Sequence, residues 1–406
     1  MRIKRRPEDF EVEEILRFPR DRKGKYFVHL LRKKKMDTLQ ALARVAREAG
    51  VSVGEIGIAG LKDKQGITTQ YISIPGKKVQ VRGRGLEVRF LGRSPVPVSS
   101  SLSEGNRFRI RVGGLGREDV DGLEGRLEEI DRFGLPGYFD DQRFGCLKHG
   151  QGFLLRSLLA GRPGDALKSL VAAPSRYDPP GKASLKRALA AAWGDWGTCE
   201  KIGRKLGVQG VFGFLASHPG DLYGAFRRVP LSIRLIHLYA YQSFLWNKAL
   251  SEFIRRNVDG EGRFSIPSAM GRLQVHRRLP GRDLASWRKA VLPLPAGDLE
   301  LPRPGRRNGL DRELEGALLS VLEGEGIRMK DLRLPRAAGM SFKSEERRIL
   351  LFPGDVKASP PARDPSRPGE WMIDLSFRLP RGAYASLVVK VLFPPFRKKR
   401  PRPRPV

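Results

Sequence analysis

Residues 60–70 read Gly-Leu-Lys-Asp-Lys-Gln-Gly-Ile-Thr-Thr-Gln, and this stretch places a single carboxylate, Asp63, between two lysines. The glycines on either side allow a backbone to approach a substrate closely. Residues 55–59 alternate like a short strand, so we expect Asp63 at the end of that strand or in the loop after it. If the strand continued, Lys62 and Lys64 would point to the face opposite Asp63. The two lysines would then be better placed to bind phosphate groups than to pair with Asp63. The ordinary alternative is a surface turn that carries a Lys-Asp-Lys triplet.

The composition is strongly basic. The 406 residues include 77 Lys and Arg against 44 Asp and Glu, which gives a formal net charge of +33. Such an excess favours binding to a polyanion through steering and counterion release, and it is no argument about the fold. The length suggests two or three domains with apolar cores.

Targeting signals and cysteine usage indicate the compartment. We find no apolar run of about 18 residues, no apolar stretch behind the basic N-terminus and no basic amphipathic helix, so we expect no membrane association. Cys146 and Cys199 are the two cysteines of the chain and cannot form a disulfide framework. A reduced, cytoplasmic setting follows as the expectation.

The sequence shows no pattern of metal ligands. Cys146 and His149 could face the same side of a helix, but no second pair of ligands follows them. Two unrelated side chains are the better interpretation, so we expect no metal site.

Two patterns in the first 147 residues predict regular structure. Asp37-Thr38 and Gly50 are typical start and stop signals for a helix over 38–49. We expect its apolar face to carry Leu39, Leu42, Ala43, Ala46 and Ala49. Residues 107–112 alternate as a strand, with Phe108 on an apolar face and arginines on a face that could meet solvent or RNA.

After residue 147 the character changes. Helical patterns dominate, and the clearest covers 234–254, whose aromatic residues we expect to pack in a core. A strand pattern returns at 372–377, after a linker rich in proline, serine and arginine. The last stretch, 396–406, has six positive charges and three prolines and cannot form a core. It could add non-specific attraction to RNA or serve only solubility.

Five stretches, in order along the chain, resemble the motifs of the TruD family of tRNA pseudouridine synthases. They are Arg6-Pro-Glu-Asp-Phe-Glu-Val-Glu-Glu14, residues 60–70, Gly105-Asn-Arg-Phe108, Pro136-Gly-Tyr-Phe-Asp-Asp-Gln-Arg-Phe-Gly145 and Phe377-Arg-Leu-Pro-Arg-Gly-Ala-Tyr-Ala-Ser386. Two glycines depart from the family pattern. Gly66 stands where alanine is usual, and Gly137 stands where asparagine is usual, so no polar contact from that side chain is expected here.

The resemblance implies an α+β architecture. The permuted pseudouridine synthase fold would have a mixed sheet built from both chain ends, with a large, mainly helical inserted domain. On this chain the catalytic domain would cover 1–147 and 348–395, the inserted domain 148–347, and a basic, proline-rich tail 396–406.

The resemblance also implies roles for individual residues. Asp63 would be the catalytic carboxylate, Phe108 the ring that stacks on the target uracil, and Asn106 a contact to the nucleotide or to the active-site loop. Lys4 would keep Asp63 ionised and oriented, with an ordinary surface lysine as the alternative. The remaining two site residues are Arg143, which could hold a phosphate, and Tyr384, which could close the pocket or only pack.

The reaction implied by the resemblance breaks the N-glycosidic bond of a uridine, turns the base and rejoins it through carbon. It needs no cofactor, redox step or metal. Whether the aspartate attacks the sugar, attacks the base or removes a ribose proton to give a glycal stays open. The implied substrate is tRNA, with uridine 13 of the D-arm as the typical target, and we expect a monomer without an obligatory protein partner.

Two other classes of function also fit parts of the sequence. A non-catalytic, basic RNA-binding or ribosome-associated protein would show the same charge but would not need Asp63 in its glycine frame. A metal-dependent nuclease would need Asp140 and Asp141 to converge with further carboxylates around a metal pair roughly 3.5–4 Å apart. The sequence offers no convincing partners for these two aspartates.

Overall fold

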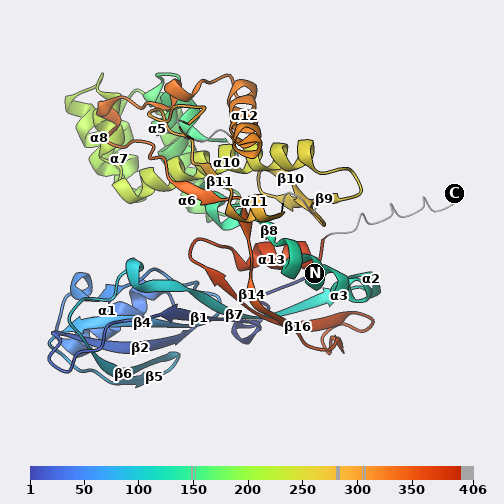
Figure 1. Ribbon diagram of the computed structural model, residues 1–406. Coiled ribbons are helices and arrows are strands. Elements are labelled where there is room, and N and C mark those ends of the chain that lie inside the picture. The colour runs from blue at the N-terminus through green and yellow to red at the C-terminus, as the bar shows by residue number, and fades with distance from the viewer. Residues whose placement is uncertain (148–149, 151, 280–283, 304, 306–307, 395–406) are drawn as a thin grey trace, which may run out of the picture. The chain divides into compact units, whose positions relative to one another are not determined.

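The computed structural model describes residues 1–406 except 148–149, 151, 280–283, 304, 306–307 and 395–406, so His149 and the basic tail lie outside the described residues. The chain divides into two compact units (Figure 1). Unit 1 comprises Met1–Leu135 and the described chain from Leu351 on, and unit 2 comprises Pro136–Leu350. The domain limits expected from the sequence lie after residues 147 and 347, whereas the units divide after Leu135 and Leu350.

Unit 1 is built on a sheet of ten strands in which β3 and β15 flank the main path. The main strand order is β14-β16-β7-β1-β4-β2-β6-β5. The strands are β1 (Phe10–Leu16), β2 (Tyr26–Lys34), β3 (Gly57–Ile58), β4 (Ile67–Pro75), β5 (Val81–Gly83), β6 (Leu86–Ser94), β7 (Ser103–Leu115), β14 (Gly354–Ala358), β15 (Ala362–Arg363) and β16 (Trp371–Pro380). The helices are α1 (Thr38–Ala49), α2 (Arg117–Asp121), α3 (Leu123–Phe133) and α13 (Ala385–Leu392).

The sheet is mixed and joins the two ends of the chain. Strand β1 pairs with β4 in parallel and with β7 in the antiparallel sense. Strand β16, from the C-terminal part, pairs with β7 along its length, from Trp371 opposite Leu115 to Pro380 opposite Gly105. The expected α+β fold with a sheet from both chain ends is confirmed.

The N-terminal helix is confirmed, but its predicted apolar face is partly wrong. The Asp37 side chain accepts a hydrogen bond from the Leu39 N–H at 2.8 Å, and Gly50 ends α1 with φ +61°. Leu39 and Ala43 are exposed. The buried face follows helical spacing from the first residue of α1 and carries Thr38, Ala41, Leu42, Val45, Ala46 and Ala49.

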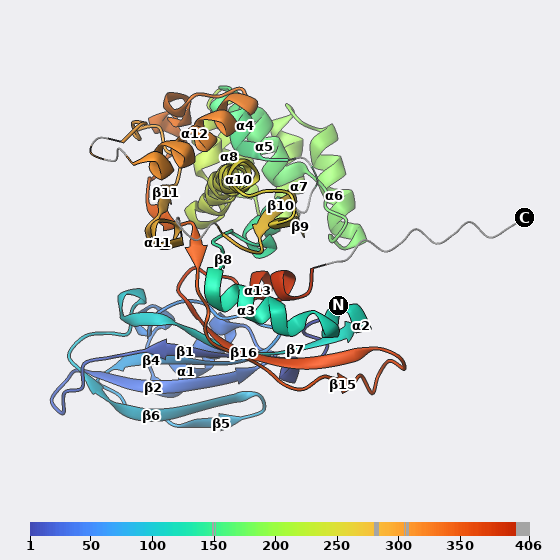
Figure 2. The same cartoon turned by 45° about the vertical axis from the view of Figure 1, so that its right-hand side comes forward.

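Strand β7 alternates as predicted. Phe108, Ile110 and Val112 are buried, and the arginines between them are exposed. Figure 2 shows α3 and α13 side by side over the part of the sheet formed by β7 and β16. The predicted strand over 372–377 is part of β16.

Unit 2 is mainly helical. Its helices are α4 (Leu154–Leu159), α5 (Pro163–Ala172), α6 (Pro180–Ala191), α7 (Trp196–Leu206), α8 (Gln209–Ser217), α9 (Leu222–Arg227), α10 (Leu231–Asn257), α11 (Leu284–Lys289) and α12 (Gly309–Gly324). Its strands are β9 (Arg263–Ser268), β10 (Gly271–His276), β11 (Val291–Pro293) and β12 (Glu346–Arg348), and the short strands β8 (Leu135–Pro136) and β13 (Leu350–Leu351) span the two crossings between units. The predicted core helix is α10, in which Trp246 and Phe253 are fully buried.

Candidate active site

Asp63 lies in the loop that connects β3 to β4, as the sequence predicted. The loop is tied to the start of α1, because the Thr38 hydroxyl donates to the Lys62 carbonyl at 3.0 Å and accepts from the Lys62 N–H at 3.1 Å. Gly66, at the end of the loop, passes close to β1. A Cβ at this position would lie 2.3 Å from the Phe10 carbonyl oxygen, so this chain has no room for an alanine there without a backbone shift.

The Asp63 carboxylate is bound on both oxygens. Its Oδ1 accepts from the Gln65 N–H at 2.9 Å, and its Oδ2 accepts from the Lys4 ammonium. The side chain of Asp63 is 25% exposed and that of Lys4 is 29% exposed, so the pair is open to a substrate. Burial by itself would raise the pKa of Asp63, but the hydrogen bonds from Lys4 and Gln65 and the charges of Lys4 and Lys33 outweigh it and lower the pKa below the usual aspartate value. The carboxylate is therefore ionised at neutral pH.

The N-terminal segment positions Lys4. The backbone N–H of Arg2 donates to the Gly113 carbonyl at 2.7 Å, and Arg5 forms an ion pair with the buried Asp364 at 2.8 Å. Lys4 itself has φ +61°, in the left-handed region that a non-glycine residue adopts at a cost. This backbone conformation is held by the contacts on both sides and delivers the ammonium to Asp63.

A row of three aromatic rings begins beside Lys4. The Lys4 ammonium lies over the Phe10 ring, 3.9 Å from its centroid. The Phe10 ring meets the Phe108 ring edge-on at 6.2 Å between centroids, and Phe108 stacks on Phe377 at 5.6 Å. The structure thus places Phe108 in the same cluster as Asp63 and Lys4. Phe108 is 8% exposed, so little of its ring reaches the surface.

Polar atoms without partners lie on the same face of the sheet as Phe108. Asn106 precedes Phe108 by two residues, and its Oδ1 is buried without a hydrogen-bond partner among the described residues. The same holds for Thr68 Oγ1 and Gln70 Oε1 on β4, whose Thr68 aligns with Val12, the residue opposite Phe108. Buried polar groups are normally satisfied, so unpaired ones indicate places where a ligand or water can bind.

The structure corrects the interpretation of Lys62. Its ammonium forms an ion pair with Glu14, whose carboxylate is fully buried and also accepts from the Tyr71 N–H at 2.9 Å. Because the Lys62 side chain is 11% exposed and serves Glu14, it is not available for phosphate groups. Lys64 is exposed.

Lys33 is a site residue that sequence reasoning missed. It lies on β2 and donates to the Asp63 carbonyl at 2.8 Å. It belongs to the basic run 32–35, which looks like a solvated segment. The available signal was the strand alternation, since Lys33 shares the inward phase with Leu31 and both are buried.

Two of the three arginines on the exposed side of β7 are paired with carboxylates. Arg111 binds Asp374 through two hydrogen bonds of 2.7 Å, and Arg107 lies 3.6 Å from Glu13. The side of this strand that could meet solvent or RNA therefore carries acidic partners for Arg107 and Arg111.

The other predicted residues have their own surroundings. Tyr384 is half-buried in unit 1, at the start of α13. Arg143 belongs to unit 2, where its guanidinium lies 5.2 Å from the centroid of the Phe139 ring. A Cβ at Gly137 would lie 2.5 Å from the Arg348 carbonyl oxygen, so an asparagine would not fit without a backbone shift.

The described residues provide no cluster for the metal-dependent alternative. No group of three or more His, Cys, Asp or Glu side chains is arranged to hold a metal ion among them. Asp141 instead accepts a hydrogen bond from the Ala269 N–H at 2.7 Å. Cys146 is a free thiol whose pKa burial raises to about 11.

No helix within the described ranges is long and apolar enough to cross a membrane.

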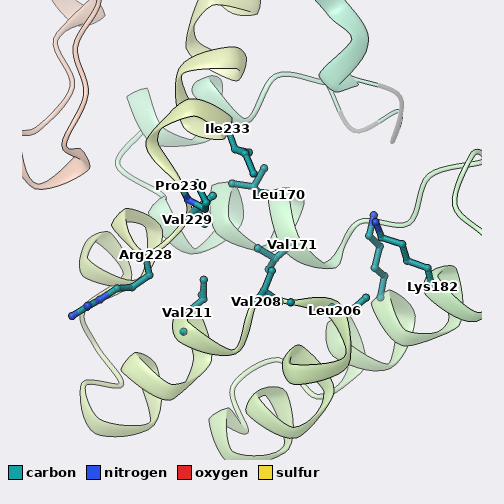
Figure 3. A pocket seen from close by; sticks show the side chains of 13 residues that line it. Leu170, Val171, Lys182, Leu206, Val208, Val211, Arg228, Val229, Pro230 and Ile233 are labelled. Atoms are coloured by element: carbon teal, nitrogen blue, oxygen red, sulfur yellow. The ribbon is translucent and has the colours of Figure 1, made fainter. Parts of the chain in front are cut away.

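Unit 2 contains a hollow of about 430 Å³ whose lining differs in chemistry from the surroundings of Asp63. Figure 3 shows aliphatic side chains lining it, with the cationic groups of Lys182 and Arg228 on opposite sides. No carboxylate and none of the predicted site residues line this hollow. The candidate active site is therefore the Asp63 cluster of unit 1.

Comparison with known proteins gives one consistent result. Residues 1–392 match the family described as tRNA pseudouridine synthase D (TruD). The chain is 31% identical over 97% of its length, and 92% of the relative's, to the "Probable tRNA pseudouridine synthase D 2" of Methanocaldococcus jannaschii. It is 30% identical, over 97% of its length and 98% of the relative's, to the tRNA pseudouridine synthase D of Aquifex aeolicus. A crystal structure described as a "tRNA pseudouridine synthase D (TruD)" from Methanosarcina mazei superposes with a TM-score of 0.72 at 26% identity, over 96% of this chain and 93% of that one.

Proposed function

We propose, on the premise that this chain belongs to the TruD family of tRNA pseudouridine synthases, that it isomerises uridine to pseudouridine in tRNA with Asp63 as the catalytic carboxylate. The observation that carries the proposal is the state of Asp63. It is an ionised carboxylate, partly open to solvent, held between Lys4 and the Gln65 N–H. Lys4 lies over the ring of Phe10, which in turn meets the ring of Phe108.

The chemistry asks little of the protein besides this group. The bond between N1 of the uracil and C1′ of the ribose breaks, and a bond between C5 and C1′ forms. The proton on C5 is lost and N1 gains one, so the product is an isomer and no oxidant or reductant is consumed. An ionised aspartate can act as nucleophile towards sugar or base, or as the base that yields a glycal.

The neighbours of Asp63 suit a flipped uridine. The target must leave its stack and be received by an apolar or aromatic surface. Phe108 would supply the ring, and the unpartnered Asn106 Oδ1 would accept a hydrogen bond from the nucleotide. Tyr384 would close the pocket, and Arg143 would hold a phosphate of the substrate.

Further parts of the proposal follow from family membership. Unit 1 is the catalytic domain, unit 2 is the inserted domain that helps to select the substrate, and the target is uridine 13 of the D-arm. The protein acts in the cytoplasm as a monomer without an obligatory protein partner.

A tRNA labelled with tritium at C5 of its uridines tests the function directly, because isomerisation releases that hydrogen to water. Purified wild-type protein should release tritium, and mapping should locate the pseudouridine at uridine 13. Binding of tRNA with no release and no pseudouridine would instead support the non-catalytic RNA-binding alternative.

A further inference from the structure

Lys33 is a buried lysine whose ammonium, among the described residues, donates to backbone carbonyls alone. It is 1% exposed and donates to the carbonyl oxygens of Met36 at 2.9 Å, Lys62 at 3.3 Å and Asp63 at 2.8 Å. These bonds use all three donors of the ammonium group. Two of the three acceptors are the consecutive carbonyls on either side of the Asp63 N–H.

Packing does not explain a cation at this position. Burial is the largest influence and lowers the pKa of Lys33, the charge of Lys62 acts in the same direction, and Asp37 and Asp63 only partly offset them. An apolar side chain of similar length would fill the same space without the cost of removing a charge from water. What a lysine supplies here and an apolar side chain cannot is a set of hydrogen bonds to the carbonyls, together with a positive charge near Asp63.

Thr38 holds the same stretch of backbone from a second element. Its side chain is buried at the first position of α1 and exchanges two hydrogen bonds with the backbone of Lys62. The Lys62 carbonyl thus receives a hydroxyl from α1 and an ammonium from β2. Strand β2 and helix α1 together fix the backbone that leads into Asp63.

We propose that Lys33 and Thr38 form a clamp that positions the catalytic carboxylate of Asp63, an inference that rests on the proposed function. With the carbonyls of Lys62 and Asp63 fixed, the Asp63 side chain leaves the loop toward Lys4. Without the clamp, the peptide between these residues can rotate and carry the carboxylate away from the reacting atoms. Both clamp residues act through Asp63 and need no contact with the substrate.

The kinetic test uses Lys33→Met, Thr38→Val and the double variant, with Lys34→Met as a matched control. Lys34 is the next residue of β2, and its exposed ammonium pairs with Glu8. Lys33→Met should lower the single-turnover rate by about 10²-fold, the loss expected for a misplaced catalytic group. Thr38→Val, which removes the two hydrogen bonds between Thr38 and the Lys62 backbone, should lower it by about tenfold. The affinity for tRNA should not change in either variant.

The double variant separates a shared clamp from two independent effects. Because both side chains hold one stretch of backbone, the loss in the double variant should be smaller than the product of the two single losses. A merely structural role would instead reduce the folded fraction and the tRNA affinity together. Wild-type rates in folded Lys33→Met and Thr38→Val would overturn the proposal.

Hydrogen exchange read by mass spectrometry follows the loop without any assay of activity. Peptides covering residues 59–70 should exchange faster in Lys33→Met, while peptides of α10 should keep the wild-type rate. If Lys33→Met does not fold, Thr38→Val decides by the same two measurements. If the wild-type protein forms no pseudouridine, the proposed function fails, and unchanged exchange in the loop would separately remove the clamp.

Discussion

The two faces of the sheet in unit 1 use positive charge in opposite ways. On the loop face, which carries Asp63 and Phe108, Lys33 is buried and binds backbone carbonyls. On the arginine face, which carries Arg107, Arg109 and Arg111, the cations are exposed, and Arg111 is paired with Asp374. Two of the three arginines of this face, Arg107 and Arg111, therefore have acidic partners in the structure. A net charge of +33 therefore does not locate the site, whereas the partners of each charge do.

Among substitutions on the two faces, we expect Asp63→Asn on the loop face to have the largest effect on turnover. The amide keeps the shape of the side chain and removes the charge that the reaction needs. Turnover on tRNA should fall by about 10³-fold or more, as is typical when a catalytic group is lost, while the melting temperature and the tRNA affinity stay near those of the wild type. Turnover close to the wild-type rate would refute the catalytic role of Asp63.

Lys4→Met tests the charge on the loop face through pH. In the wild-type protein Lys4 helps to lower the pKa of Asp63 against the effect of burial, so the carboxylate stays ionised as the pH falls. Without Lys4 the pKa of Asp63 rises and its carboxylate binds a proton at a higher pH. The acid limb of the pH–rate profile therefore shifts to higher pH. We expect a loss of about 10- to 10²-fold near neutrality from poorer orientation, and a larger loss as the pH falls.

The control for this experiment is again Lys34→Met, which removes an equal charge from the surface. Its pH profile should match that of the wild type. An acid limb of Lys4→Met that coincides with the wild-type limb would show that Lys4 does not act on the ionisation of Asp63.

Local patterns predicted the frame of the site, and long-range pairing decided the rest. Alternation in β7 and the loop at Asp63 follow from neighbouring residues and could be read from the sequence. The pairing of Lys62 with Glu14 could not, because it joins residues 48 positions apart across a sheet whose register the sequence does not reveal. Lys33 falls between these cases, since its inward phase was visible but two of its three carbonyl partners come from another loop.

The same distinction applies to α1 and β7. The limits of α1 followed from its capping residues, but its buried face depends on how the helix lies on the sheet, so Leu39 was misplaced. The arginines of β7 were correctly placed on one face, while their acidic partners come from β1 and β16. Strand β16, which carries Asp374, lies in the C-terminal part of the chain, far in sequence from β7.

Phe108→Leu asks whether the ring on the loop face receives a base. Leucine keeps much of the packing against Phe10 and Phe377 but cannot stack on a uracil. Loss of one stacking contact costs roughly 1 kcal/mol at the lower end, or about fivefold in catalytic efficiency. Phe90→Leu on β6 is the matched control, because Phe90 contacts Phe27 and His29 outside the cluster. Equal catalytic efficiency in both variants would rule out the stacking role.

The smallest effect is expected on the arginine face, from Asp374→Asn. This change removes the carboxylate that binds Arg111 through two hydrogen bonds and leaves the guanidinium free. An exposed pair of this kind contributes about 0.2–1 kcal/mol to stability, so the protein should remain folded. If this face bound RNA, the freed arginine would tighten tRNA binding and increase the salt dependence by roughly one phosphate contact. We expect neither change, because the substrate is expected on the loop face. A measured gain in affinity that disappears at high salt would move the RNA to the arginine face and end the contrast between the two faces.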